Sequence, residues 1–188
     1  MNQEIFNNVF RLIDNAENYI LIDMFLFNDN YSNKSEYPNL AKKLTKKLID
    51  KKKRNSSIKI IFITDKINTF YGSYKNKYIE RLRDNNIDVV MTNLDKIRNS
   101  NFLYSGYWDI LLEKFYNPKY KGDLFKSPFG DNKKVSLMSM FKLLNFKANH
   151  RKTIVTEKNG MVISANPHGA SFYHSNIGFK FKGDLLND

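Results

Sequence analysis

Three short apolar runs, each preceded by a segment with helical periodicity, constrain the fold of this 188-residue chain most strongly. The runs cover residues 19–27, 58–64 and 87–92. Their β-branched and aromatic residues are typical of strands that are buried on both faces. The repeated order of helix and strand predicts an α/β fold with a mainly parallel mixed sheet and helices on both faces. Because open α/β sheets bind ligands at the carboxyl ends of their strands, we expect the functional site at that edge.

The second part of the chain begins with an aromatic-rich insertion at about 95–146, where the alternation lapses. It forms either a lid or an interfacial surface, because aromatic residues beside lysines suit the lipid headgroup boundary. Alternatively, it forms two helices, at about 104–116 and 136–146, whose rings pack onto the sheet, which is the interpretation that we favour. Three more strands follow, at 151–156, 160–166 and about 176–181, which makes residues 1–188 one domain.

Composition limits the classes of partner. The net charge of +12 favours a polyanion such as nucleic acid, anionic lipid or a phosphate substrate, although a bias toward Lys, Asn and Ile also raises the lysine content. The charges concentrate in one helical segment, where they form either a binding face or a solvated face: Lys42, Lys43, Lys46, Lys47, Lys51, Lys52, Lys53 and Arg54.

The absence of cysteine excludes disulfides and thiolate metal sites. No apolar run approaches the roughly 20 residues that a membrane-spanning helix needs, and the N-terminus lacks a signal-peptide pattern. We therefore expect a chain that is cytoplasmic or peripheral at the membrane surface.

All three histidines, His150, His168 and His174, lie in one polar window. On a strand, His150 and Lys152 face the same side. This pair suits a phosphodiester, because an imidazole can attack phosphorus while the ammonium neutralises the oxygens that gain charge. Ser164 and Asn166 alternate in the same way at the end of the next strand, where both can donate hydrogen bonds to the same phosphoryl group.

These residues, with Glu157, resemble the HKD motif of the phospholipase D superfamily, written His-x-Lys-x4-Asp-x6-Gly-Ser-x-Asn. The order of elements before them resembles the N-terminal half of bacterial cardiolipin synthase-like enzymes. The resemblance implies one phospholipase D-like domain in which His150 forms a phosphohistidine, Lys152 and Asn166 bind phosphoryl oxygens, and Ser164 assists. It implies no cofactor and no metal. Water as second substrate then gives hydrolysis, and an alcohol gives phosphatidyl transfer.

Three positions depart from the family pattern. Glu157 replaces an Asp that plays a structural role, and Ile163 replaces the Gly before the serine, where it can crowd the backbone. Asn176 is the nearest equivalent of a Glu that holds the nucleophilic histidine in the family. His168 and His174 lie outside the motif and are expected to be bystanders, although His174 can touch a substrate headgroup.

The implied mechanism needs a second histidine as general acid, and the chain has no second His-x-Lys. Either two chains share one site, or this is the first half of a two-motif protein, which we favour because the chain ends just after the strand that follows the motif. The leading hypothesis is a phospholipid-directed phosphodiesterase or phosphatidyltransferase. The alternatives are a homodimeric, metal-independent nuclease and a noncatalytic basic module that binds anionic lipid or nucleic acid.

Overall fold

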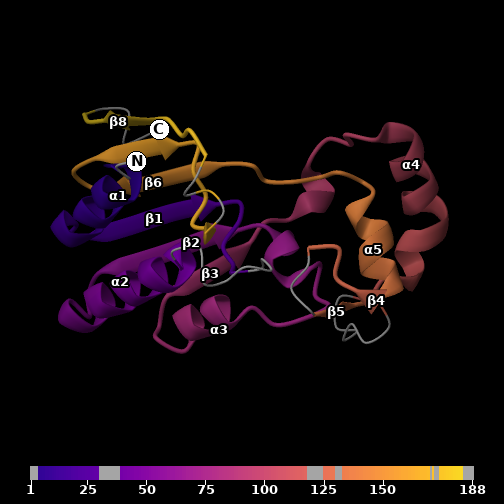
Figure 1. Ribbon diagram of the computed structural model, residues 1–188, viewed down its shortest axis with the longest axis horizontal. Helices are drawn as coiled ribbons and strands as arrows, with labels where there is room; N and C mark the ends of the chain where they lie inside the picture. The colour runs from indigo at the N-terminus through magenta and orange to yellow at the C-terminus, as the bar shows by residue number, and fades with distance from the viewer. Residues whose placement is uncertain are drawn as a thin grey trace.

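Six strands form the central sheet of the computed structural model, which describes residues 4–29, 39–117, 125–129, 133–169, 171 and 174–183 (Figure 1). Parts of the aromatic insertion, residues 118–124 and 130–132, lie outside the described residues. The first three strands are β1 (Tyr19–Met24), β2 (Lys59–Thr64) and β3 (Asp88–Met91). The helices that precede them are α1 (Glu4–Asn15), α2 (Leu40–Arg54) and α3 (Lys77–Arg83). These six elements confirm the helix and strand order predicted from the periodicity.

The strand order is β3-β2-β1-β6-β7-β8, with β6 (Lys152–Thr156), β7 (Gly160–Ile163) and β8 (Gly178–Phe181). The pairs β1–β2 and β2–β3 are parallel, whereas β6 pairs antiparallel with both β1 and β7, and β7 pairs antiparallel with β8. The sheet is therefore mixed, as predicted, but the parallel pairing is confined to one half of it. The strands after the insertion have no crossover helix between them, and strands that are joined directly pair antiparallel.

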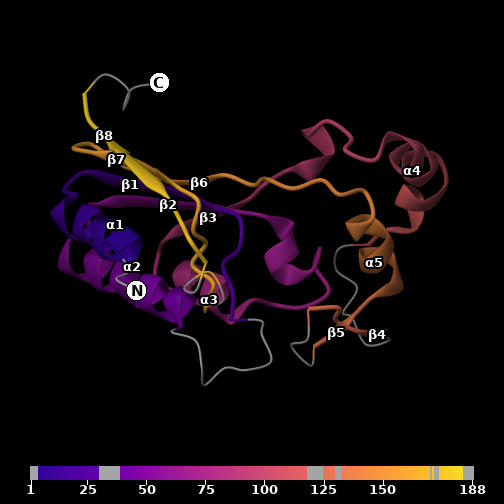
Figure 2. The ribbon, with the colours of Figure 1, turned by 45° about the horizontal axis from the view of Figure 1, so that its top comes forward.

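One face of the sheet packs against the helices. Side chains that alternate along β1, β2 and β6, such as Ile22, Phe62 and Ile154, are fully buried in one apolar cluster with residues of α1, α2 and α3. Figure 2 shows these three helices together below the sheet. In the described part of the chain, the helical cover therefore lies on one face, where the sequence predicts it on both.

The opposite face carries apolar side chains that remain partly accessible. Val162 of β7 is 46% exposed, Phe179 of β8 is 65% exposed, and Val90 of β3 is 47% exposed. On this face the ring of Phe181 covers Gly160 so closely that a Cβ atom there would lie 2.2 Å from it. The apolar residues of the strands therefore give the sheet two apolar faces. The sequence pattern does not distinguish the face that a helix covers from the face that stays accessible to solvent.

The lysine-rich segment of α2 is partly committed to local contacts. Lys47 and Arg54 form ion pairs with Asp14 of α1. Lys51 donates to the carbonyl oxygen of Asp14, and Lys52 donates to that of Ile58 beside β2. Half of the predicted basic face therefore attaches α2 to its neighbours, and the other half faces solvent.

The insertion forms a second body of structure at the carboxyl ends of β1 to β3 (Figure 1). It contains α4 (Phe102–Tyr107), continued by a π-helical turn (Trp108–Leu112) and a 3-10 turn (Glu113–Phe115), then β4 (Phe125–Lys126), β5 (Lys134–Val135) and α5 (Leu137–Leu143). A second apolar cluster joins the insertion to the segment after β2: it contains Val135 of the insertion, Leu94, and Ile67 of the 3-10 turn η1 (Lys66–Thr69). The two predicted helices are present. The Trp108 ring contacts the Tyr116 ring, and the Tyr116 hydroxyl group donates to the Tyr71 carbonyl oxygen outside the sheet. Among the described helices, none combines the length and the apolar character needed to cross a membrane.

Candidate functional site

The predicted site residues gather at the edge of the sheet where the parallel strands end. β6 runs antiparallel to β1, so that Lys152 lies opposite Met24, the last residue of β1. Ser164 directly follows β7, and its backbone N–H donates to Ile177 just before β8. The expected location at the carboxyl ends of the parallel strands therefore agrees with the geometry, because β6 begins and β7 ends at this edge.

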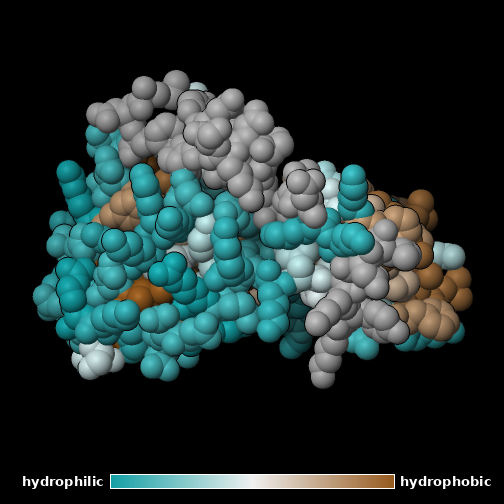
Figure 3. Space-filling view, turned by 60° about the horizontal axis from the view of Figure 1, so that its bottom comes forward, coloured by the Kyte–Doolittle hydropathy of each residue, from teal (hydrophilic) through white to brown (hydrophobic). Residues whose placement is uncertain are grey.

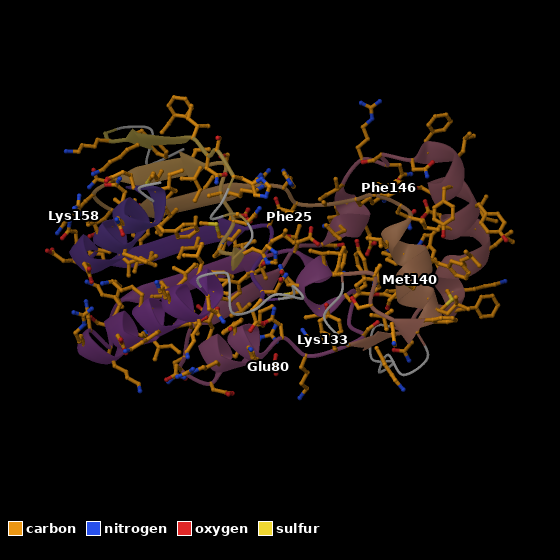
Figure 4. The ribbon with its side chains drawn as sticks, in the orientation of Figure 1. Phe25, Glu80, Lys133, Met140, Phe146 and Lys158 are labelled. Carbon is orange, nitrogen blue, oxygen red and sulfur yellow. The ribbon has the colours of Figure 1, made fainter. Side chains whose placement is uncertain are left out.

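His150, Lys152 and Phe25 form the centre of the candidate site. The Nζ atom of Lys152 lies 3.2 Å from Nδ1 of His150 and donates to the His150 carbonyl oxygen at 2.8 Å. The Phe25 ring lies 4.5 Å from the imidazole between centroids, and Lys152 Nζ lies 5.3 Å from the same ring. Lys152 is 5% exposed, whereas His150 is exposed. In Figure 4, Phe25 lies where the sheet meets the insertion. The buried Lys152 ammonium thus contacts the solvent-accessible imidazole of His150.

Burial and charge set the protonation of this pair. Burial lowers the pKa of His150 below its ordinary value, and the positive charge of Lys152 lowers it further. Burial also lowers the pKa of the Lys152 ammonium, while the charge of Asp23 opposes this shift. Because a lowered histidine pKa favours the uncharged ring, the imidazole is neutral at neutral pH, which is the form that can act as a nucleophile.

Asn149, which the sequence did not single out, fixes the backbone beside His150. Its Nδ2 group donates to both carboxylate oxygens of Asp23, at 2.8 and 3.1 Å, and to Thr92 Oγ1 at 3.0 Å. Its backbone N–H donates to Asp65 Oδ2 at 2.7 Å. Asn149, Asp23 and Asp65 are all buried. Asn149, the residue before His150, is therefore hydrogen-bonded to side chains at the ends of all three parallel strands.

Both carboxylates of this network are destabilised as anions by their surroundings. Burial raises the pKa of Asp23, although the hydrogen bond from Asn149 and the charges of Arg151 and Lys152 oppose the shift. Burial raises the pKa of Asp65 as well, against hydrogen bonds from the backbone of Ile67 and Asn149. The visible signal in the sequence was a polar residue at these two places, because Asp23 interrupts one apolar run and Asp65 closes the next.

Asn166 and Ser164 lie at the same edge through separate hydrogen bonds. Asn166 Oδ1 accepts from the backbone N–H of Leu26 at 3.1 Å, and Leu26 is the neighbour of Phe25. Because the oxygen of this side chain is occupied, its Nδ2 group is the part that can donate to a ligand. Ser164 Oγ accepts from the N–H of Ile177 at 2.9 Å and donates to Asn176 Oδ1 at 3.1 Å.

Asn176 holds Ser164 and not His150. Its Oδ1 atom accepts from Ser164, and its Nδ2 group donates to the carbonyl oxygens of Ser171 and His174. The expected role of Asn176 as the acceptor for the imidazole N–H is thus absent from this arrangement, in which Lys152 occupies the Nδ1 side of the ring. Asn176 instead orients the hydroxyl group that is predicted to assist at the phosphoryl group.

The other two histidines belong to the segment between β7 and β8. His168 is half-buried, its Nδ1 atom lies 3.3 Å from the carbonyl oxygen of Asn28, and burial lowers its pKa despite that contact. It lines a pocket of about 150 Å³ together with Leu26, Asn28, Ile67 and Phe129. The side chain of His174 is exposed. In the described residues, no three His, Asp or Glu side chains group in a way that could hold a metal ion.

Glu157 lies at the opposite edge of the sheet, in the turn between β6 and β7. Its carboxylate accepts from the backbone N–H groups of Glu17, Asn18 and Tyr19, with the shortest bond 2.6 Å. Burial would raise its pKa, but these N–H donors outweigh burial and hold the pKa below its ordinary value. Glu157 therefore anchors the start of β1, which suits the structural role predicted for this motif position.

A Glu157→Gln variant is expected to unfold more easily by about 1–2 kcal/mol, because the amide offers one acceptor oxygen where the carboxylate offers two charged ones. Since the folded-state pKa is lowered, the carboxylate stabilises the fold above its ordinary pKa and loses this effect as the pH falls through the folded-state value. Denaturant unfolding at pH 7 and pH 3 measures the difference. The exposed Glu113→Gln change serves as control, and an equal loss in both variants would contradict the anchoring role.

Two features of this segment differ from the family motif: the spacing between Glu157 and Ser164, and the residue at position 163. Six residues separate Glu157 from Ser164, one fewer than the motif has, yet Ser164 still follows β7 at the edge where β6 begins. Ile163 is 5% exposed and points into the sheet core, where Gly178 on β8 gives it room, since a Cβ atom there would lie 3.2 Å from Ile163 Cγ2. The expected crowding by Ile163 is thus relieved on the core side and does not reach the site.

The mixed sheet and the helices that flank it form an α/β fold that is also seen in a solved structure. Among solved structures, the chain is similar to Nuc from Salmonella typhimurium, a phospholipase D family member, with a TM-score of 0.50 and 14% sequence identity over 96% of this chain and 78% of that chain. No protein-family model and no curated protein matches the sequence. The likeness shows the fold, and the cardiolipin synthase-like resemblance stays a prediction.

Proposed function

We propose that this chain provides the nucleophilic half of a phospholipase D-like phosphodiesterase or phosphatidyltransferase that acts on phospholipid through a phosphohistidine at His150. The observation that carries the proposal is the buried Lys152 ammonium 3.2 Å behind an exposed, neutral imidazole. The Asn166 amide group and the Ser164 hydroxyl group at the same edge add the donors that a phosphoryl group needs.

The resting hydrogen bonds suggest how substrate triggers the nucleophile. A charged Lys152 that donates to Nδ1 of His150 leaves the ring proton on Nε2. When a phosphodiester binds, its anionic oxygen competes for the ammonium, and Nδ1 is released to take a proton. Because the ring is exposed, water can move the proton from Nε2 to Nδ1, and Nε2 then attacks phosphorus.

The attack forms an N–P bond and breaks the bond between phosphorus and the leaving oxygen, which must take up a proton. The proposed source is the histidine of a second HKD motif, from a further part of the protein or from a second chain. Water or an alcohol then attacks phosphorus, releases His150, and gives a hydrolysed or a transferred phosphatidyl group.

An aryl phosphodiester tests the first step without the second histidine, because a nitrophenolate leaves without a proton. The protein is mixed with a phosphorus-labelled nitrophenyl phosphodiester, denatured after about one turnover, and digested to locate label. Label on His150 that survives base and is lost in acid supports the proposal. Absence of label from the chain, both alone and mixed with a second-motif domain, overturns it.

A homodimeric, metal-independent nuclease is the second candidate, favoured by the net charge of +12. It predicts a dimer on gel filtration and cleavage of DNA in the presence of EDTA. A strictly monomeric chain that turns over phospholipid but not DNA contradicts it. If salt-dependent binding of anionic lipid or DNA survives in His150→Ala and no turnover occurs in any assembly, the chain is a noncatalytic binding module.

A further inference from the structure

The helical segment 102–115 of the insertion exposes many of its apolar side chains to solvent instead of burying them against the protein. Ser105 and Trp108 are buried against the insertion. The outward side chains are Phe102, Leu103, Tyr107, Ile110, Leu111 and Phe115, and their exposed fractions run from 44% to 77%. We call these six residues, with Leu144 and Phe146, the apolar tip. Figure 3 shows apolar side chains gathered at this end of the molecule.

Two residues after α5 extend the tip toward the candidate site. Asn101 donates to the carbonyl oxygen of Leu144 at 3.3 Å, which places Leu144 beside the start of α4. Leu144 is 41% exposed and Phe146 is 63% exposed. Phe146 also has a φ of 52°, a left-handed conformation that is strained for a bulky residue.

The charge of the insertion as a whole favours an anionic surface over a second copy of the chain. The described residues of 95–146 hold seven Lys or Arg and three Asp or Glu. Lys114 lies in the helical segment beside the tip, with its ammonium 5.1 Å from the Phe115 ring centroid, and the same segment carries the exposed Asp109 and Glu113. Two such insertions, each with more basic than acidic residues, would repel each other, whereas anionic lipid headgroups attract the basic residues while the rings enter the acyl boundary.

We propose that the apolar tip docks the protein on the surface of an anionic lipid bilayer. Phe146 precedes His150 by four residues, which span at most about 14 Å. With Phe146 at the acyl boundary, His150 lies at or just above the layer of headgroup phosphates. The docking itself does not require catalysis, but its consequence, delivery of a phospholipid phosphodiester to His150, rests on the proposed function.

Vesicle flotation tests the docking with the whole chain. Wild-type protein is mixed with vesicles of phosphatidylglycerol and phosphatidylcholine, or of phosphatidylcholine alone. We expect binding to the anionic vesicles that weakens with added salt and falls about a hundredfold in Ile110→Ser/Phe115→Ser, roughly tenfold for each lost side chain. Phe179→Ser, which removes an equally exposed ring from the sheet, is the matched control and should bind as the wild type does.

Equal binding of the double variant and the wild type overturns the proposal, and so does a wild type that binds neither vesicle. A wild-type dimer that the double variant disperses in analytical ultracentrifugation also overturns it, because the tip is then a protein interface. The two proposals fail separately. Vesicle binding without phosphohistidine contradicts the proposed function alone, and phosphohistidine without tip-dependent binding contradicts the docking alone.

Discussion

A His150→Ala variant is expected to form no phosphohistidine and to lose at least about 10⁴-fold in turnover of a nitrophenyl phosphodiester, as expected for loss of a nucleophile. The physical reason is the position of the ring, which stands exposed in front of the buried Lys152. No other histidine in the described site is placed against this cation. Stopped-flow release of nitrophenolate, with labelled product analysed after denaturation, measures both quantities.

The pH dependence of label transfer to His150 independently reports the protonation state of its ring. Because burial and the Lys152 charge lower the pKa of His150 below its ordinary 6.5, the neutral ring persists as the pH falls through that value. The decline in the rate of label transfer on acidification should therefore be centred below pH 6.5. Removing the cation in Lys152→Met should move this decline to higher pH, in addition to slowing transfer, because the neighbouring charge no longer opposes protonation of the ring.

His174→Ala is the matched control, because it removes an exposed histidine outside the motif. It should retain label on His150. Label that persists in His150→Ala would assign the nucleophile to another residue, and a decline centred above pH 6.5 in the wild type would contradict the lowered pKa.

An Asn149→Ala variant is expected to lose about 3 kcal/mol of unfolding free energy, the range for buried charged groups that lose their donors. The variant removes the amide that donates to both oxygens of Asp23 and to Thr92, and it leaves the Asp23 carboxylate buried without that donor. Because Asn149 also fixes the backbone before His150, label transfer should slow even at temperatures where the variant is folded. Urea unfolding and transfer kinetics on one preparation measure both effects.

The stability deficit of Asn149→Ala should shrink on acidification. The hydrogen bond from Asn149 lowers a pKa of Asp23 that burial raises, so the folded-state pKa rises further in the variant. A carboxyl group whose folded-state pKa exceeds its unfolded value opposes folding at high pH, and this cost disappears as the pH falls through the folded-state pKa. The gap to the wild type should thus be smaller at pH 5 than at pH 8. Asn85→Ala, whose side chain donates only to Arg81 at the end of α3, should change stability little at either pH.

The order of elements and the location of the site could be predicted from the sequence because both depend on local patterns. Apolar runs mark β1 to β3, and the alternation of His150 with Lys152 places two functional groups on one strand. The strands predicted at 151–156 and 160–166 also appear, as β6 and β7. Each of these signals lies within a few neighbouring residues.

The parts that could not be predicted depend on residues that are far apart in the chain. Asn149 meets Asp23 across 126 positions, and nothing near either residue reveals the other. The partner of Asn176 is Ser164 and not His150, because Lys152 already occupies the Nδ1 side of the imidazole. The sequence also does not reveal which face of the sheet is open, because a valine under a helix and a valine in solvent produce the same alternation.

The separation of the two apolar clusters affects how the site is held together. One cluster lies between the sheet and its helices. The other joins the segment after β2, with Ile67 and Phe70, to Val135 of the insertion, and Phe25 packs against it. Clusters with separate contacts tend to open as separate cooperative units. If the second cluster opened while the sheet stayed folded, Phe25, whose ring contacts His150, would lose its packing on that side. A surface that binds the protein only while this cluster is packed would raise the fraction of molecules with an assembled site. Binding to that surface and assembly of the site are then linked by mass action.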